Sequence, residues 1–166
     1  MKPAWTEGHL RITRSVISRV DEEAVAAFGR DEESCGLLLG PEGYPLFVDE
    51  LVPMENRANK LHKLDPETYP RRGRMYFDID PMKFERAVRA GESNGRPVKV
   101  LYHSHLDVGA YFSETDAAAA TMGGDAPAYD VAYLVTSVRG GVVDDRKLFV
   151  WDAAGRRFAE SPLTIV

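Results

Sequence analysis

The sequence predicts an α/β fold in which a mixed sheet is packed by helices. Short apolar runs with the length of strands alternate along the chain with segments whose apolar residues recur at helical spacing. No internal repeat or low-complexity segment interrupts this alternation. The length of 166 residues fits one domain. We therefore expect residues 1–166 to form a single domain with its core between about residues 10 and 151.

The first third of the chain is expected to supply three strands and a helix. Residues 10–16 alternate between apolar and polar side chains, which is typical of a half-buried strand. Asp21 is a candidate N-cap for a helix over residues 22–29. Residues 35–40 form an apolar run that ends in glycine, which favours a core strand, and residues 46–52 are its expected hairpin partner.

Residues 56–74 show no clear period and few large apolar side chains, which predicts a long, mobile loop. Between Arg57 and Arg74 the chain has six basic and two acidic residues, so this loop carries a net charge of +4 on an acidic protein. A basic loop of this kind is usually solvated surface, but it can also guide a charged partner.

The second half of the chain is expected to complete the sheet. Residues 75–79 resemble a strand, and Asp80 followed by Pro81 is typical of a helix start. The apolar face of that helix is expected to consist of Phe84, Ala87 and Val88. The remaining elements are expected to be strands over 98–102, 131–135 and 147–151 and a short helix over 113–122.

The composition excludes several classes of protein. No apolar run is long enough to cross a bilayer, and the N-terminus lacks the apolar region of a secretory signal, which favours a cytoplasmic protein. A single cysteine, Cys35, excludes a disulfide framework and a zinc site built from several thiolates. Because it begins an apolar strand, burial in the core is favoured over a nucleophilic role. The net charge of −5 argues against binding of nucleic acid through its phosphates.

The most informative pattern follows the strand expected over residues 98–102. His103 and His105 are two residues apart, so their side chains point to the same face and can converge on one ion. Asp116, from the next helix, can add a carboxylate oxygen. Two imidazoles and one carboxylate would leave a tetrahedral zinc ion with a fourth position for water, as in catalytic sites. Ser113, three residues before Asp116, also fits the capping box of a helix.

A hydrolytic zinc site also needs a general base close to the metal. Asp31, Glu32 and Glu33 directly precede the predicted core strand, where an acid can reach the two histidines. The spacing alone does not choose among these three residues.

Three segments together resemble the JAMM (MPN+) metalloproteases, whose pattern is a glutamate upstream of His-Ser/Thr-His-x7-Ser-x2-Asp. These segments are Glu33–Gly40, His103-Ser104-His105 and Ser113–Asp116. The resemblance extends from about Leu10 to Trp151, in the order of elements as well as in the motif. It implies a cytidine-deaminase-like JAMM/MPN fold and one zinc ion per chain.

The resemblance also implies a role for each residue of the pattern. The implied metal ligands are His103, His105 and Asp116. Glu33 matches the general base, Ser113 the donor to the oxyanion, and Ser104 a residue that supports the ligand strand from behind. The implied reaction is hydrolysis of a peptide or isopeptide bond.

The chain is similar to the compact prokaryotic members of this family. The segment between Asp116 and Val131 is short and free of cysteine, so it lacks the zinc-stapled insertion of relatives that bind ubiquitin chains. The implied partner is a ubiquitin-like or sulfur-carrier protein whose C-terminal tail ends in Gly-Gly. That tail would pair as an added strand between the 56–74 loop and the strand edge near the metal, and the basic loop would face an acidic carrier.

Three alternative interpretations fit the sequence less well. A non-catalytic scaffold domain of the same fold usually lacks the ligands, which are all present here. The DNA-repair-associated branch usually has asparagine between the histidines and then Pro-Ser-Gly, whereas this chain has Ser104 and residues 106–108 read Leu-Asp-Val. A nucleoside deaminase requires a Pro-Cys-x-x-Cys segment that one cysteine cannot supply. Relatives often have proline where this chain has Leu106, which leaves the shape of the 106–112 loop open.

Overall fold

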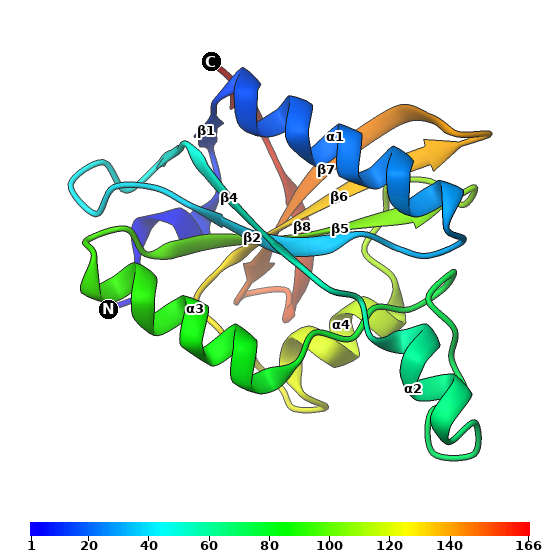
Figure 1. The fold of residues 1–166 in the computed structure, drawn as a ribbon. Coiled ribbons are helices and arrows are strands. Elements are labelled where there is room, and N and C mark those ends of the chain that lie inside the picture. The colour runs from blue at the N-terminus through cyan, green and yellow to red at the C-terminus, as the bar shows by residue number, and fades with distance from the viewer.

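The computed structural model describes residues 1–166 and contains a mixed six-stranded sheet with helices on both faces, together with a smaller three-stranded sheet (Figure 1). The strand order is β4-β2-β5-β6-β7-β8 in the large sheet and β3-β1-β9 in the small one. The predicted α/β class is confirmed, but the second sheet was not predicted.

The helices are α1 (Arg14–Gly29), α2 (Ala58–Leu64), α3 (Pro81–Ser93) and α4 (Glu114–Thr121), with a 3-10 helix over Ala4–Glu7. The strands are β1 (Leu10–Ile12), β2 (Cys35–Leu39), β3 (Phe47–Val48), β4 (Glu50–Met54), β5 (Val98–Leu106), β6 (Ala132–Arg139), β7 (Val142–Asp152), β8 (Arg157–Ser161) and β9 (Leu163–Ile165).

The predicted strand over residues 10–16 is confirmed only over residues 10–12, and the helix cap predicted at Asp21 is wrong. The strand ends at Ile12 because Thr13 is the N-cap of α1, and its hydroxyl oxygen accepts the N–H of Val16 at 3.2 Å. Asp21 therefore lies inside the helix, where its carboxylate pairs with Arg146 at 2.5 Å. The alternation of apolar and polar residues over 10–16 therefore spans both a short strand and the first turn of a helix.

The core consists of two apolar layers, one on each face of the large sheet. α1 and the small sheet cover one face, and α3 and α4 lie across the other (Figure 1). Strand β5 occupies the middle, antiparallel to β2 and parallel to β6, and all nine of its residues are buried. Because β5 runs to Leu106, it extends beyond the expected range of 98–102 and includes both histidines of the motif.

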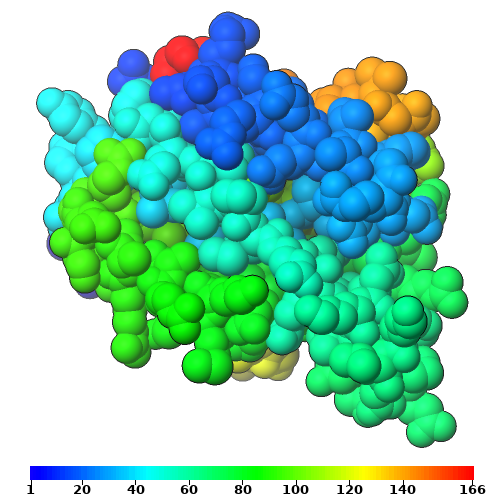
Figure 2. Space-filling view, viewed as in Figure 1, coloured from blue at the N-terminus to red at the C-terminus, as the bar shows by residue number.

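The connection from β4 to α3, residues 55–80, projects from the edge of the sheet, and we call it the excursion (Figure 2). The expected loop over residues 56–74 is wrong in part, because it contains α2. The strand expected over residues 75–79 is also wrong, because this segment pairs with no strand of either sheet. Its backbone is held instead by side chains of the excursion.

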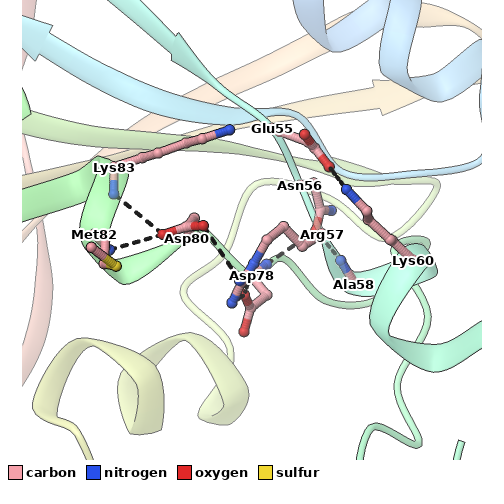
Figure 3. A network of polar contacts seen from close by, with 9 residues as sticks. All are labelled: Glu55, Asn56, Arg57, Ala58, Lys60, Asp78, Asp80, Met82 and Lys83. Atoms are coloured by element: carbon pink, nitrogen blue, oxygen red, sulfur yellow. Dashed lines mark hydrogen bonds and ion pairs between the residues drawn. The ribbon is translucent and has the colours of Figure 1, made fainter. Parts of the chain in front are cut away.

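The helix start at Asp80 is confirmed. Its carboxylate accepts the N–H groups of Met82 and Lys83 at 2.9 and 3.3 Å, and Pro81 is the first helical residue (Figure 3). The hairpin partner expected over residues 46–52 is confirmed in part: β4 pairs antiparallel with β2 from residue 50 onward, whereas β3 pairs with β1 in the small sheet. The excursion is therefore bounded by two elements that the sequence predicts.

Candidate metal centre

Strand β5 carries His103 and His105 into the interior, where they are 1% and 3% exposed. Because alternate residues of a strand point the same way, both imidazoles face the side of the sheet that α3 and α4 cover. Their Nε2 atoms lie 3.3 Å apart. The expected convergence is present, although within the strand and not after its end.

The orientation of each imidazole has a local cause. Nδ1 of His105 lies 2.9 Å from the carbonyl oxygen of Gly109, which can only accept, so Nδ1 carries a hydrogen and Nε2 is the ring nitrogen that faces the site. Nδ1 of His103 is buried without a hydrogen-bond partner, and its ring stacks on Phe77 with centroids 4.6 Å apart. Both rings thus present Nε2 to the same point.

The first turn of α4 brings Asp116 to that point. The Ser113 hydroxyl accepts the N–H of Asp116 at 3.0 Å, and the Asp116 carboxylate accepts the N–H of Ser113 at 3.0 Å, so the capping box is complete. The same carboxylate oxygen, Oδ2, lies 3.2 Å from Nε2 of each histidine. The three atoms therefore form a nearly equilateral triangle.

The environment of Asp116 favours its charged form. Burial acts to raise the pKa of this carboxyl, but the adjacent His103 charge, hydrogen bonds to both imidazoles and the Ser113 N–H outweigh burial and lower it. A buried carboxylate that stays ionised beside two imidazole nitrogens is a suitable cation ligand.

The register of β2 on β5 places Glu33 at the same site. Cys35 lies opposite His103, so two residues earlier Glu33 comes opposite His105. Glu33 is 5% exposed, and its Oε1 has no hydrogen-bond partner. Burial raises the pKa of its carboxyl, and the charge of Asp116 raises it further.

The acids next to Glu33 are directed elsewhere. Asp31 pairs with Arg74 at 2.5 Å, and Glu32 pairs with Arg30 at 2.9 Å. Of the three acids that spacing could not separate, only Glu33 enters the site.

Glu33 is held at its backbone by an asparagine that the sequence analysis missed. The side-chain N–H₂ of Asn56 donates to the carbonyl oxygens of Glu33 and Tyr76, both at 3.0 Å. Its Oδ1 accepts the N–H groups of Ala58 and Asp78, also at 3.0 Å (Figure 3). The whole hydrogen-bonding capacity of this buried amide joins Glu33 to the excursion.

A second contact completes this backbone clamp. The N–H of Glu33 donates to the carbonyl oxygen of Gly73 at 2.7 Å, and the N–H of Gly73 donates to Asn59 at 2.8 Å. No local pattern in the sequence marks Asn56 or Gly73, because the bonds that tie them to Glu33 join residues 23 and 40 positions apart.

Ser104 and Ser113 lie on either side of the ligands. The Ser104 hydroxyl accepts the N–H of Ser34 at 2.8 Å, which ties the strand of the two histidines to the segment that contains Glu33. The Ser113 hydroxyl oxygen accepts one bond in the capping box, and its hydrogen remains free to donate.

Leu106 extends β5 by one residue, paired with Val138. The chain then turns at Asp107, whose φ of 61° is left-handed and whose carboxylate accepts the N–H of Gly140 at 2.9 Å. This turn presents the Gly109 carbonyl to His105. Cys35 is 2% exposed, as expected, and burial raises the pKa of its thiol.

These residues fit a bound metal ion. Glu33, His103 and His105 each place a potential ligand atom within 4.8 Å of the other two. The unpartnered Oε1 of Glu33 and the converging Nε2 atoms are the donors such an ion requires, and imidazole ligands favour a transition metal over calcium or magnesium.

A mixed sheet with a His-x-His pair on its central strand, an aspartate from the following helix and a buried glutamate is characteristic of JAB/MPN domains. The chain matches the prokaryotic homologs of the JAB domain over residues 14–152 and belongs to that family. The family includes metalloproteases. No curated protein matches the chain in sequence.

Solved structures agree in fold. A protein from Desulfitobacterium hafniense is 20% identical with a TM-score of 0.65, and one from Salinibacter ruber is 23% identical with a TM-score of 0.62; each match covers 95% of this chain and 92% of the other. A JAB1/MPN domain protein from Archaeoglobus fulgidus is 18% identical with a TM-score of 0.53, over 95% of this chain and 99% of its own. No helix of the structure has the length and apolar character needed to span a membrane.

Proposed function

We propose that this protein is a zinc-dependent peptidase or isopeptidase that hydrolyses the amide bond after the C-terminal Gly-Gly tail of a ubiquitin-like or sulfur-carrier protein. The observation that carries the proposal is the triangle of His103, His105 and Asp116 with the unpartnered carboxyl of Glu33 beside it. A buried carboxyl without a partner is costly to fold, so a reaction that uses it explains its presence.

The size of the triangle favours zinc. In a regular tetrahedral site with metal–ligand bonds of about 2.0–2.1 Å, the ligand atoms lie about 3.3 Å apart. The observed separations are 3.2, 3.2 and 3.3 Å. When bound, zinc supplies a Lewis acid that polarises a carbonyl group and acidifies water.

The protein's own groups would perform the proton transfers. Glu33 takes a proton from the attacking water and then gives it to the departing amine. Its clamped backbone fixes the carboxyl for both transfers. Ser113, whose hydroxyl hydrogen is free, donates to the oxyanion of the tetrahedral intermediate. Ser104 keeps the Glu33 segment in register with the ligand strand.

Two features support a protein tail as the substrate. β4 is an edge strand that pairs only with β2, so its outer edge is open to an extended tail. In the excursion, Lys63, Arg71 and Arg72 have no acidic partner within the chain, unlike the other three basic residues. They are exposed and can attract an acidic carrier.

The proposal is tested by metal analysis and by intact-mass analysis of sulfur-carrier and ubiquitin-like fusions after incubation with the protein. We expect one zinc per chain and cleavage directly after Gly-Gly that a chelator abolishes. Glu33→Ala should keep zinc and lose hydrolysis, whereas His103→Ala should lose both. Glu32→Gln is the matched control, because Glu32 is adjacent but paired with Arg30, and it should cleave normally.

A different experimental result would contradict each part of the proposal. Full zinc occupancy in His103→Ala would contradict the ligand assignment. Wild-type rates in Glu33→Ala would contradict the base. A zinc-loaded protein that cleaves none of the fusions would require a different substrate class.

A further inference from the structure

A cavity of about 310 Å³ lies beside the metal centre, between residues 76–79 of the excursion, α4 and the sheet. His103 and Asp116 form part of its wall, so the cavity and the metal centre share two residues. Glu33 and Ser113 do not line it. The cavity therefore extends to one side of the reacting groups.

The cavity is apolar and has no free charge. Eleven of its fifteen lining residues are hydrophobic. Of its two acids, Asp116 belongs to the metal centre and Asp78 accepts bonds of 2.9 and 2.6 Å from Arg57 (Figure 3). A charged occupant would find no partner here, whereas an apolar one would be removed from water.

Aromatic rings dominate the walls, and one of them has an unused polar group. Phe77 and Phe112 both pack on His103, with centroids 4.6 and 6.4 Å away. The floor includes Tyr133, which is 3% exposed and whose hydroxyl has no hydrogen-bond partner.

We propose that this cavity is a specificity pocket that takes one large apolar side chain, aromatic above all, from a substrate residue that flanks the Gly-Gly dipeptide at the scissile bond. The inference rests on the proposed function and deepens it. A cavity of about 150 Å³ can hold benzene, so 310 Å³ has room for a phenylalanine or tryptophan side chain. Edge and stacked contacts with the aromatic walls favour aromatic over aliphatic occupants.

The pocket restricts which tails fit the site. Glycine has no side chain, so a Gly-Gly tail leaves the cavity empty. An extended chain advances about 3.3–3.6 Å per residue, so the side chain must come from the residue just before Gly-Gly or from the residue just after it.

The selectivity test uses carrier fusions in which each of these two positions is Phe, Leu, Ala or Asp in turn. We expect Phe at one of the positions to raise kcat/KM at least about tenfold over Ala. Ala119→Phe, at an exposed α4 position that lines the cavity, should abolish the preference. Ala118→Phe is the matched control, because Ala118 is also exposed on α4 but borders a different hollow, and the preference should remain.

A second measurement does not depend on hydrolysis. N-acetyl-phenylalanine amide is titrated into the Glu33→Gln protein, and the methyl resonances of Ala120 and Met122, which line the cavity, are followed by NMR. We expect saturable shifts that are absent with N-acetyl-alanine amide and absent in the Ala119→Phe protein.

The two measurements separate failure of the pocket from failure of the proposed function. Cleavage with equal rates for all residues, together with no binding of the phenylalanine amide, would overturn the pocket and leave the peptidase intact. Saturable binding blocked by Ala119→Phe, with no fusion cleaved, would support the pocket and overturn the proposed substrate.

Discussion

The two sides of the candidate site are held in different ways. His103 and His105 lie in the central strand, whose backbone pairs with β2 as far as His103 and with β6 from Val100 to Leu106. Glu33 lies before the start of β2, and its backbone is held by Asn56 and Gly73 of the excursion. The ligand side therefore shares the stability of the fold, whereas the glutamate side depends on a few specific hydrogen bonds. Metal binding and hydrolysis should accordingly be separable by mutation.

The largest expected effect comes from removing a ligand. Loss of a hydrogen bond that supports a ligand typically lowers metal affinity by about 10–100-fold. His105→Ala should lower zinc affinity by more than this, because it removes a coordination bond. Zinc at about 100 times its Kd should stabilise the wild type by about 2.7 kcal/mol and stabilise the variant far less. Competition with a chromophoric chelator and thermal unfolding measure both effects.

His62→Ala is the control for that variant, since His62 lies in the excursion and contacts only Tyr69 and Arg72 among the polar groups. It should bind zinc like the wild type. An equal loss of zinc affinity in His105→Ala and His62→Ala would contradict the assignment of His105 to the ligand side of the site.

The next largest effect concerns the clamp. Asn56→Ala removes four hydrogen bonds, which should lower the free energy of unfolding by about 2–4 kcal/mol. Because Glu33 loses its position while the ligands keep theirs, kcat/KM should fall by about 10–100-fold at normal zinc content. Metal analysis, steady-state kinetics and urea unfolding separate these effects. Asn94→Ala, at the exposed end of α3, is the matched control, and zinc loss in Asn56→Ala would contradict the prediction.

The ligand side could be predicted from the sequence because the positions of its residues depend on patterns between near neighbours in the chain. Alternation along one strand places His103 and His105 together, and the capping pattern places Asp116 at the start of a helix. Choosing Glu33 over Glu32 required the family resemblance, because the choice depends on the register of β2 against β5. Register is a property of two strands and does not appear in either one alone.

The excursion could not be predicted for a related reason. Residues 75–79 belong to no strand, and the bonds that hold them come from Asn56 and Arg57, about twenty positions earlier. Such long-range side-chain bonds leave no periodic signal in the sequence. The start of α1 was missed because a three-residue strand and the first helical turn share one apolar alternation.

Substitution of two glycines, one in the sheet and one in the excursion, tests how each side of the site is held. A Cβ on Gly36 in β2 would lie 2.4 Å from the hydroxyl oxygen of buried Tyr102, whereas a Cβ on Gly73 would lie 2.9 Å from the Cβ of Glu32. Gly36→Ala should lower the free energy of unfolding by about 1–3 kcal/mol through overpacking, with zinc retained. Gly73→Ala should cost less stability but reduce kcat/KM more, because it shifts the carbonyl that holds Glu33. If Gly36→Ala reduced kcat/KM more than Gly73→Ala, the sheet and not the excursion would determine the position of Glu33.

Near the N-terminal end of β5, the charged side chain of Lys99 plays a structural part similar to that of Asn56. The buried ammonium of Lys99 donates to the carbonyl oxygens of Pro41, Tyr44 and Phe47 at 2.8–2.9 Å. Like Asn56, it gathers an irregular segment through backbone groups. Burial lowers its pKa to about 8, whereas the amide of Asn56 does not titrate.

The last predicted effect is a pH dependence confined to the Lys99 cluster. A lysine in the unfolded chain keeps its proton up to a pKa of about 10.4, so between pH 8 and 10 the unfolded state binds more protons than the folded state. The free energy of unfolding should then rise with pH across this window relative to Lys99→Met, in which the contribution is absent. Urea unfolding at several pH values measures the difference, and groups common to both proteins cancel. Lys83→Met, at an exposed position, should follow the wild type. A flat difference would mean that three carbonyl acceptors fully offset burial, and Lys99 and Asn56 would then hold their segments in the same, pH-independent way.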